Sequence, residues 1–317
     1  MNKQDNSSLP EDVSQKNKKH RRTDIKTDRF IPKPDWLRVK LPSGDNFRKI
    51  KSFHDQLGIK SVCKEANCPN RGECWNTGTA SFMLMGDTCT RGCRFCAVKT
   101  SKNPPALDPS EPKKLAETLS NLNLNYVVLT TVDRDDLPDQ GANHITRCIK
   151  EIKTRLPDLI IEALIPDFRG IPELLDIVSH SGAEVISHNI ECTRTMTQKV
   201  RDPRAGYDQS LQVLHYIKST YPELYTKSSL MLGFGEREDE ILQTMQDLRD
   251  VNTDFLTLGQ YLQPSRHKLP VEKYYHPDVF KQLGEKGREL GFEYVASGPL
   301  VRSSYKAAEH YLANKLS

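Results

Sequence analysis

The sequence predicts an α/β protein built on a partial (βα)6 barrel, with an N-terminal cysteine-rich extension and a C-terminal helical extension. Six short apolar runs alternate with amphipathic stretches between Phe82 and Phe255. The runs are apolar on both faces, as buried parallel strands are, and the stretches between them are long enough for helical crossovers. A doubly wound open sheet has the same alternation and remains the alternative. A chain of 317 residues can hold one barrel with appendages.

Each expected element follows from its local pattern. The expected strands are short and apolar: Phe82–Met85, Tyr126–Thr131, Leu159–Leu164, Glu184–Ser187, Ser229–Gly233 and Phe255–Leu258. The expected barrel helices repeat apolar residues at three- and four-residue spacing: Pro112–Leu122, Asn143–Arg155, Ile171–Ser179, Asp208–Ser219 and Asp239–Arg249. Two more helical patterns follow the barrel, at Pro277–Leu290 and Ser304–Leu316.

The pattern divides the chain into a flexible polar tail (1–30), a loop-rich cap (31–80), the barrel (81–260) and a C-terminal extension (261–317). The first 29 residues hold eight Lys and Arg against five Asp and Glu. This surplus of three positive charges is most of the whole-chain net charge of +4. The rest of the chain is therefore nearly neutral, which disfavours nucleic acid as a partner. No apolar run is long enough to span a bilayer, so we expect a soluble protein without a membrane partner.

Cysteine is unevenly distributed. Six of the eight cysteines fall within one 34-residue stretch: Cys63, Cys68, Cys74, Cys89, Cys93 and Cys96. The tail lacks the apolar core of a secretory signal, so metal binding is favoured over disulfides. The isolated Cys148 and Cys192 are expected to be small packing residues.

The second cysteine triplet, Cys89-x3-Cys93-x2-Cys96, directly follows the first expected strand. Three thiolates on a short loop can hold three irons of a [4Fe–4S] cluster and leave the fourth iron open. A structural zinc site needs a fourth protein ligand, and no Cys or His stands nearby to supply one. The spacing, with Phe95 before the last cysteine, resembles the radical S-adenosylmethionine (SAM) superfamily. That resemblance implies a cluster that binds SAM and cleaves it to a 5′-deoxyadenosyl radical.

The first triplet, Cys63-x4-Cys68-x5-Cys74, has a different spacing. By spacing alone it fits a second cluster, a zinc site or three buried thiols equally well. Several longer strings reduce these options, in this order along the chain: CKEANCPNRGECW, GDTCTRGCRFCAVKT, VDRDDLPD, PDFRG, LGQYLQPS and ASGPLVRSSY. Together these strings, which cover the chain from about Trp36 to Tyr305, resemble the lipoyl synthase family.

The resemblance implies a sulfurtransferase that inserts two sulfur atoms at C6 and C8 of a protein-bound octanoyl chain. It implies an auxiliary [4Fe–4S] cluster, consumed as the sulfur donor, with Cys63, Cys68, Cys74 and Ser304 as ligands. The implied partners are octanoylated lipoyl domains of 2-oxoacid dehydrogenase E2 subunits or the glycine-cleavage H protein, and flavodoxin or ferredoxin as reductant. Without the resemblance, Ser304 would be read as the N-cap of the helix that follows. A serine oxygen is a poorer match for cluster iron than a thiolate, so such a ligand can be released.

Other polar residues stand where barrel sites assemble, at the carboxyl ends of strands. Asp133 and Arg134 follow one strand, Glu162 lies in the next, and Asn189 follows the fourth; we expect contacts with SAM there. For the Asp133 loop, local ion pairs are the alternative, and His188 is expected to be a core histidine. Arg302 is expected to contact substrate or to anchor the C-terminal segment. Many relatives read His-Asn-x-Glu-Thr where this chain has Cys192 after Glu191, so no role is assigned to that carboxylate.

Two other functions stay open at this point. A different sulfur-inserting radical enzyme, such as a biotin synthase or a methylthiotransferase, would lack the first triplet and the Arg-Ser-Ser-Tyr string. An iron–sulfur carrier or a zinc-stabilised interaction protein would bind metal without cleaving SAM. The acidic residues of the tail are unusual in a transit peptide, so we expect a bacterial cytoplasmic protein, with the mitochondrial matrix as the alternative.

Overall fold

The computed structural model describes residues 31–38, 48, 61, 70, 81–122 and 124–304. The tail, most of the cap with the first cysteine triplet, and the expected helix beyond Ser304 lie outside the described residues. Their predicted structures and roles therefore stay predictions. No described helix is both long enough and apolar enough to cross a membrane.

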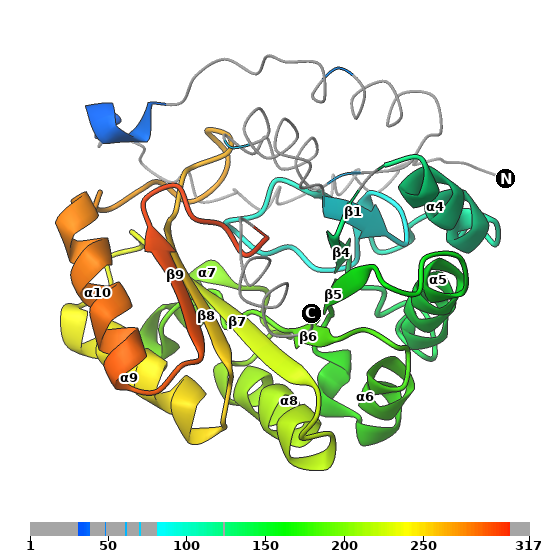
Figure 1. The fold of residues 1–317 in the computed structure, drawn as a ribbon. Coiled ribbons are helices and arrows are strands. Elements are labelled where there is room, and N and C mark those ends of the chain that lie inside the picture. The colour runs from blue at the N-terminus through cyan, green and yellow to red at the C-terminus, as the bar shows by residue number, and fades with distance from the viewer. Residues whose placement is uncertain are drawn as a thin grey trace, which may run out of the picture. The chain divides into compact units, whose positions relative to one another are not determined.

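In the described part of the chain, seven parallel strands form one curved sheet in the order β1-β4-β5-β6-β7-β8-β9 (Figure 1). The strands are β1 (Ser81–Leu84), β4 (Tyr126–Thr131), β5 (Ile160–Leu164), β6 (Val185–Ser187), β7 (Tyr225–Leu232), β8 (Phe255–Gln260) and β9 (Tyr294–Gly298). The spatial order follows the chain order without reversal, as in a barrel and unlike a doubly wound sheet. Since β1 and β9 are not paired with each other, the barrel is partial.

Helices from the connections cover the outer face of the sheet (Figure 1). They are α4 (Glu111–Ser120), α5 (Ala142–Arg155), α6 (Pro172–Ser179), α8 (Tyr207–Thr220), α9 (Glu238–Asp250) and α10 (Pro277–Glu289). One apolar core lies behind the first four strands, where Leu129 of β4 and Ile149 of α5 are fully buried. A second core lies behind β7 and β8, where Leu258 packs in one cluster with Met245 of α9. The burial of these faces fixes the helices on the sheet.

The structure confirms the six expected strands and the expected helices that fall among the described residues, with two differences. Strand β7 begins at Tyr225 and not at Ser229. The apolar pattern missed its first residues because they include Lys227, a charged residue that is completely buried. Strand β9 was not expected at all. Short irregular elements were also not expected: η1 (Asp35–Leu37), β2 (Thr88–Cys89), β3 (Lys99–Thr100), η2 (Phe168–Gly170), η3 (Arg194–Met196) and α7 (Thr197–Val200).

The interior of the barrel is layered along the strand direction. Near the amino ends, the Tyr225 and Phe255 rings stack with their centroids 5.0 Å apart, and Tyr294 meets Phe255 edge-on at 6.5 Å. Two residues further along β7, which is the next inward position of a strand, lies Lys227. Beyond it, toward the carboxyl ends, the interior opens into a cavity.

Candidate active site

A cavity of about 450 Å³ lies at the carboxyl ends of the strands. Parallel barrels carry their functional groups at this end, because the loops that follow the strands converge there. The lining includes residues of β1, β4, β5, β7 and β8, of the loops that follow the strands, and of the segment after β9. Its polar and sulfur-bearing members include Cys89, Cys93, Cys96, Asp133, Asp167, His188, Asn189, Glu191, Arg201, Arg302, Ser303 and Ser304.

The second cysteine triplet lies on one loop beside this cavity. Cys89 ends β2, and the loop returns through Cys93 and Cys96 to β3, which pairs with β2 in parallel. Backbone N–H groups point at two of the sulfurs: Arg91 N lies 3.4 Å from Cys89 Sγ, and Asp202 N lies 3.4 Å from Cys93 Sγ. Such donors stabilise negative charge on sulfur and are typical around cluster thiolates. The three cysteines therefore fit a cluster site.

The surroundings of these thiols oppose ionisation in the absence of a metal. Burial, and then the nearby Asp133 carboxylate, raise the pKa of Cys89 to about 12. Burial likewise raises the pKa of Cys93 to about 12 and also raises the pKa of Cys96. A bound cation reverses this balance, because a coordinating thiol is deprotonated by the metal's charge. The site thus suits a metal cluster better than a free reactive thiol.

A buried arginine holds the cysteine loop against the sheet. Arg91, 3% exposed, donates Nε and Nη2 to Asp135, each at 2.9 Å. Its Nη1 and Nη2 also reach Asp167, at 2.5 and 2.9 Å, and Nη1 lies 3.4 Å from Asp133. These carboxylates come from loops after two neighbouring strands. Although burial alone would lower the pKa of Arg91, the carboxylates hold it above its ordinary value. A charged network therefore helps to fix the loop against the sheet.

Backbone strain places one of these carboxylates. After β5, Phe168 and Arg169 have φ values of 45° and 54°, a left-handed conformation that is costly for residues other than glycine. The Asp167 side chain accepts the N–H of Arg169 at 2.9 Å, which stabilises the turn and directs the carboxylate toward Arg91. The Pro-Asp-Phe-Arg-Gly string is thus a turn that supports the cysteine loop.

A second contact holds the other side of the loop. The Asp202 carboxylate accepts the N–H of Gly92 at 2.8 Å and Nε of Arg204 at 2.8 Å. Although burial alone would raise it, these donors hold the pKa of Asp202 at about 2. Arg204 also donates to the backbone oxygen of Thr90 at 2.8 Å. Arg91, Asp167 and Asp202 could not be predicted from the sequence, because no spacing rule marks a charged residue as buried.

Among the residues expected at the site, Asp133, Asn189, Arg302 and Ser304 line the cavity. Asn189 is 8% exposed, and its Oδ1 has no hydrogen-bond donor among the described residues, while its Nδ2 donates to Glu191. A buried amide oxygen without a donor is rare in a native protein and indicates a place for a ligand donor. Arg302 donates Nη1 to the carbonyl of the neighbouring Val301 at 2.7 Å, a contact within its own segment, so its expected role stays a prediction.

Two expected site residues have other partners. Glu162 is fully buried beneath the cavity, and its carboxylate accepts from Tyr126, Ser187 and Lys227. Arg134 forms two 2.8 Å hydrogen bonds with Asp136, the local ion pair that was the alternative for this loop. Both side chains are therefore engaged by protein groups instead of being directed into the cavity.

The carboxylate to which no role was assigned does line the cavity. Glu191 has a φ of 67°, and a backbone bridge holds it: its N–H donates to Ser229 and its carbonyl accepts from Met231, each at 3.0 Å. Burial raises its pKa. Beside it, Arg201 donates to the Ile190 carbonyl at 3.4 Å. A half-buried carboxylate on a strained backbone in a cavity is a signal of function that the sequence pattern did not supply.

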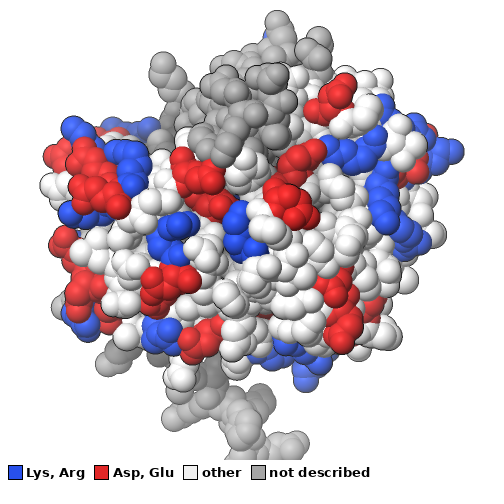
Figure 2. Space-filling model, turned by 60° about the horizontal axis from the view of Figure 1, so that its bottom comes forward, with Lys and Arg blue, Asp and Glu red and all other residues white. Residues whose placement is uncertain are grey.

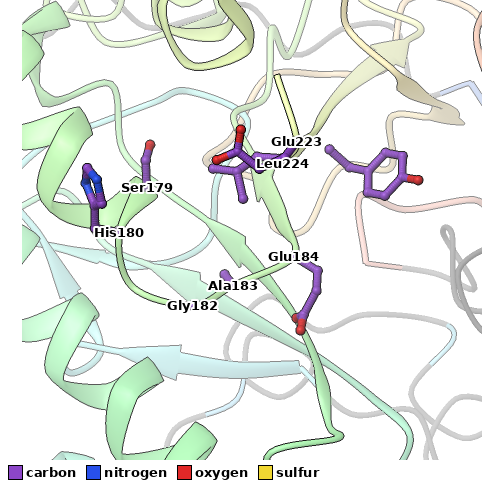
Figure 3. A pocket seen from close by; sticks show the side chains of 8 residues that line it. Ser179, His180, Gly182, Ala183, Glu184, Glu223 and Leu224 are labelled. Atoms are coloured by element: carbon purple, nitrogen blue, oxygen red, sulfur yellow. The ribbon is translucent and has the colours of Figure 1, made fainter. Parts of the chain in front are cut away.

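A second hollow, of about 360 Å³, lies outside this cavity, at the amino ends of β6 and β7. His180, Glu184 and Glu223 line it (Figure 3). It is at the opposite end of the strands from the cysteine loop. On the face that Figure 2 shows, basic and acidic side chains of the described residues are interspersed. The cavity at the carboxyl ends is therefore the candidate active site.

Family models match most of the chain. The radical SAM superfamily matches residues 83–248, which include the cysteine loop and most of the barrel. The N-terminal domain of lipoyl synthase of the radical SAM family matches residues 2–68.

Three curated relatives are similar over nearly the full chain, and each is a mitochondrial lipoyl synthase. The Branchiostoma floridae enzyme is 51% identical over 92% of this chain and 79% of its own length. The Homo sapiens enzyme is 51% identical, with 89% and 77% covered. The Schizosaccharomyces pombe enzyme is 53% identical, with 89% and 77% covered.

Solved structures support the fold alone. Methylornithine synthase aligns with a TM-score of 0.52 at 14% identity, over 83% of this chain and 86% of the other. The FeFe-hydrogenase maturase from Carboxydothermus hydrogenoformans aligns with a TM-score of 0.54 at 11% identity, over 85% and 79%. Identity at this level carries no argument about substrate.

Proposed function

Because the chain belongs to the lipoyl synthase family of the radical SAM superfamily, we propose that it inserts two sulfur atoms, at C6 and C8, into a protein-bound octanoyl chain. The single observation that carries this proposal is the cavity that holds all three cysteines of the second triplet together with Ser304. In support of the proposal, the Cys89 loop lines the same cavity as Arg302, Ser303 and Ser304.

The reaction explains why such a site is needed. C6 and C8 of an octanoyl chain carry no acidic proton and adjoin no carbonyl, so a general base has nothing to remove. Hydrogen-atom abstraction is the available route, and a cofactor has to supply it. The protein's part is to place the substrate carbon and the sulfur donor beside the radical source and to exclude water.

Cys89, Cys93 and Cys96 would hold the radical SAM [4Fe–4S] cluster, with N–H groups of Arg91 and Asp202 stabilising two of the thiolates. With SAM bound, this cluster would supply the 5′-deoxyadenosyl radical by one-electron cleavage. Asn189 would use its free Oδ1 to accept a hydrogen bond from a hydroxyl or amine of SAM. Asp133, in the lining beside Cys89, would be a second acceptor.

Cys63, Cys68, Cys74 and Ser304 would hold the auxiliary cluster, which acts as the sulfur-donating substrate. Support comes from the family membership and from the position of Ser304 in the same cavity as the Cys89 loop. A serine corner is a weaker bond to iron than a thiolate corner. That weakness suits a cluster that has to give up sulfide. Arg302, also in the lining, would contact the substrate as well as the segment's backbone.

The acceptors would be octanoylated lipoyl domains of 2-oxoacid dehydrogenase E2 subunits or the glycine-cleavage H protein, with flavodoxin or ferredoxin as reductant. The three relatives are mitochondrial enzymes, which supports the mitochondrial matrix for this chain. This reverses the order of preference that the acidic residues of the tail gave, with the cytoplasm first.

The test is anaerobic reconstitution followed by mass spectrometry of an octanoylated lipoyl-domain peptide incubated with SAM and a reductant. We expect about eight iron and eight sulfide per chain, the content of two cubane clusters, and a lipoylated peptide. Four of each would remove the auxiliary cluster. Full metal content without 5′-deoxyadenosine would support the iron–sulfur carrier instead.

A further inference from the structure

The residues that follow β9, here called the C-terminal segment (299–304), lie beside the cavity. Four of them, Val301, Arg302, Ser303 and Ser304, belong to its lining. The backbone carbonyls of this segment are bound by the body of the protein. Gln260 N donates to the carbonyl of Pro299 at 3.4 Å, and the Asn70 amide donates to the carbonyl of Leu300.

The barrel makes room for this segment by omitting a side chain. A Cβ on Gly259, in β8, would lie 2.1 Å from the carbonyl oxygen of Val301. Because the contacted atom belongs to the backbone, no side-chain rotation can relieve the clash. The glycine therefore lets the segment approach the sheet at a distance that any other residue would prevent.

The deepest contact of the segment is with a buried lysine. Lys227 donates to Oε1 and Oε2 of Glu162 at 2.6 and 2.7 Å, and it donates to the carbonyl of Ser303. An ammonium group has three hydrogens, so these three acceptors use its full capacity. Glu162 is held in turn by the hydroxyls of Tyr126, at 2.5 Å, and Ser187, at 2.8 Å. The Lys227 ammonium group is thus fixed by Glu162, which is itself held by side chains of two neighbouring strands. From this position inside the barrel it bonds to the C-terminal segment.

We infer that Lys227, held in place by Glu162, is a positioning residue for the C-terminal segment and thereby for Ser304. This inference rests on the proposed function, in which Ser304 is the fourth ligand of the auxiliary cluster. The Ser303 carbonyl is part of the peptide unit that ends at the Ser304 nitrogen. Because the peptide unit is planar, fixing that carbonyl also fixes the Ser304 nitrogen, and only a few bond rotations then separate this nitrogen from the Ser304 hydroxyl.

The ion pair itself needs a reason beyond stability. A buried pair such as Lys227 and Glu162 loses the solvation of both charges, and apolar residues of similar volume are often as stabilising. Unlike an apolar pair, this ion pair also provides a hydrogen bond to the C-terminal segment, from the Lys227 ammonium to the Ser303 carbonyl. The pair therefore gives the C-terminal segment a charged anchor inside the barrel.

The test uses a double substitution, Glu162→Met/Lys227→Met, which removes the anchor without leaving an unpaired buried charge. The matched control is Val185→Ala, a fully buried position inside the same barrel whose loss weakens packing without touching the C-terminal segment. Should the double methionine variant fail to fold, Glu162→Gln/Lys227→Met serves instead, because glutamine can still bond Tyr126 and Ser187.

The main readout is hydrogen–deuterium exchange of the reconstituted full chain, followed in the peptide that covers residues 299–304. We expect exchange of that peptide to rise about tenfold or more in the double variant, since a hydrogen bond from a charged donor is lost. Peptides from β4 to β8 should exchange as in the wild type. Unchanged exchange at 299–304, or an equal rise in Val185→Ala, overturns the inference.

Product analysis then connects the anchor to the reaction. The double variant should still form 5′-deoxyadenosine, because the Cys89 loop is held separately by Arg91 and Asp202, but the yield of sulfur insertion per 5′-deoxyadenosine should fall. An unchanged ratio in a variant whose segment exchanges faster also overturns the inference. If the wild type makes no lipoylated product, the proposed function fails, and the exchange measurement still decides whether Lys227 anchors the segment.

Discussion

Arg91 and Asp167 share two hydrogen bonds, from Nη1 to Oδ2 at 2.5 Å and from Nη2 to Oδ1 at 2.9 Å, with both side chains buried. Arg91 lies between two cysteines of the cluster loop, and Asp167 lies in the strained turn after β5. The position of the cysteines is therefore set by the sheet through a charged contact, and the geometry of that contact can be tested.

Arg91→Lys should weaken radical formation. A lysine keeps the charge but offers a single ammonium, which cannot reproduce the forked contacts with Asp135 and Asp167. A misplaced loop should lower the rate of 5′-deoxyadenosine formation by roughly ten- to a hundredfold. The rate is measured by chromatography after anaerobic reconstitution. Arg237→Lys, whose partner Asp239 is exposed, is the control and should leave the rate unchanged.

Substitutions in the two cysteine triplets should fail in different ways. Cys93→Ala should abolish 5′-deoxyadenosine, because the open-iron cluster loses a ligand. Cys68→Ala should keep some 5′-deoxyadenosine and make no thiolated octanoyl product, because the sulfur donor is lost while the other loop stays intact. Both products are measured in one reaction by mass spectrometry. Normal lipoylation by the Cys68 variant would remove the auxiliary cluster as sulfur donor.

Ser304→Ala should depress sulfur insertion while radical formation continues. If Ser304 were only a helix cap, the substitution would cost about 1 kcal/mol of stability and leave insertion intact. Ser303→Ala is the matched control, since it keeps the carbonyl that Lys227 binds. Equal product from both variants would reassign Ser304 to the cap.

His188 should make the protein less stable as the pH falls below neutrality. Burial, and then the charge of Arg201, lower its pKa from 6.5 to about 4. As the pH falls, His188 takes up a proton near pH 6.5 in the unfolded chain but only near pH 4 in the folded protein. The stability that the neutral, buried histidine contributes is therefore fully present above pH 6.5 and is lost as the pH falls from 6.5 to about 4. Between pH 7.5 and 5.5 the free energy of unfolding should fall by about 1.4 kcal/mol more in the wild type than in His188→Asn. Anaerobic urea unfolding measures the difference; identical pH profiles would contradict the prediction.

Gly259→Ala should displace the C-terminal segment. Its new Cβ would meet the carbonyl oxygen of Val301 at 2.1 Å, and overpacking of this kind costs about 1 to 3 kcal/mol. Sulfur insertion should fall while 5′-deoxyadenosine formation persists. Gly206→Ala, where the nearest contact is a side-chain atom at 3.4 Å, is the control. Full insertion by the Gly259 variant would show that the segment's close approach is not needed.

Periodicity predicted the sheet well where strands are apolar on both faces. It failed at the start of β7, because Lys227 is a charged residue in the barrel interior, and burial of charge depends on a partner that is 65 residues away. It missed β9, whose residues are only partly buried and resemble the loop around them. These are tertiary effects that a local pattern does not contain.

Only the local part of the candidate site could be predicted from the sequence. Spacing identified Cys89, Cys93 and Cys96, because three ligands on one loop are a local feature. The groups that hold the loop, Arg91 and Asp202 among them, come together only through the fold. Glu162 and Arg134 were expected at the cavity because they are polar residues near strand ends, but each is bonded to a protein partner of opposite charge.

The stacked rings of Tyr225 and Phe255 fill the amino end of the barrel interior, at the opposite end of the strands from the cavity. In the proposed reaction an octanoyl chain would therefore enter from the carboxyl ends of the strands and leave the same way, while its other end stays attached to the acceptor protein. The acceptor would rest above the carboxyl ends of the strands and insert only its octanoyl arm. The reach of that arm, and not the depth of the barrel, would set how closely the two proteins have to approach.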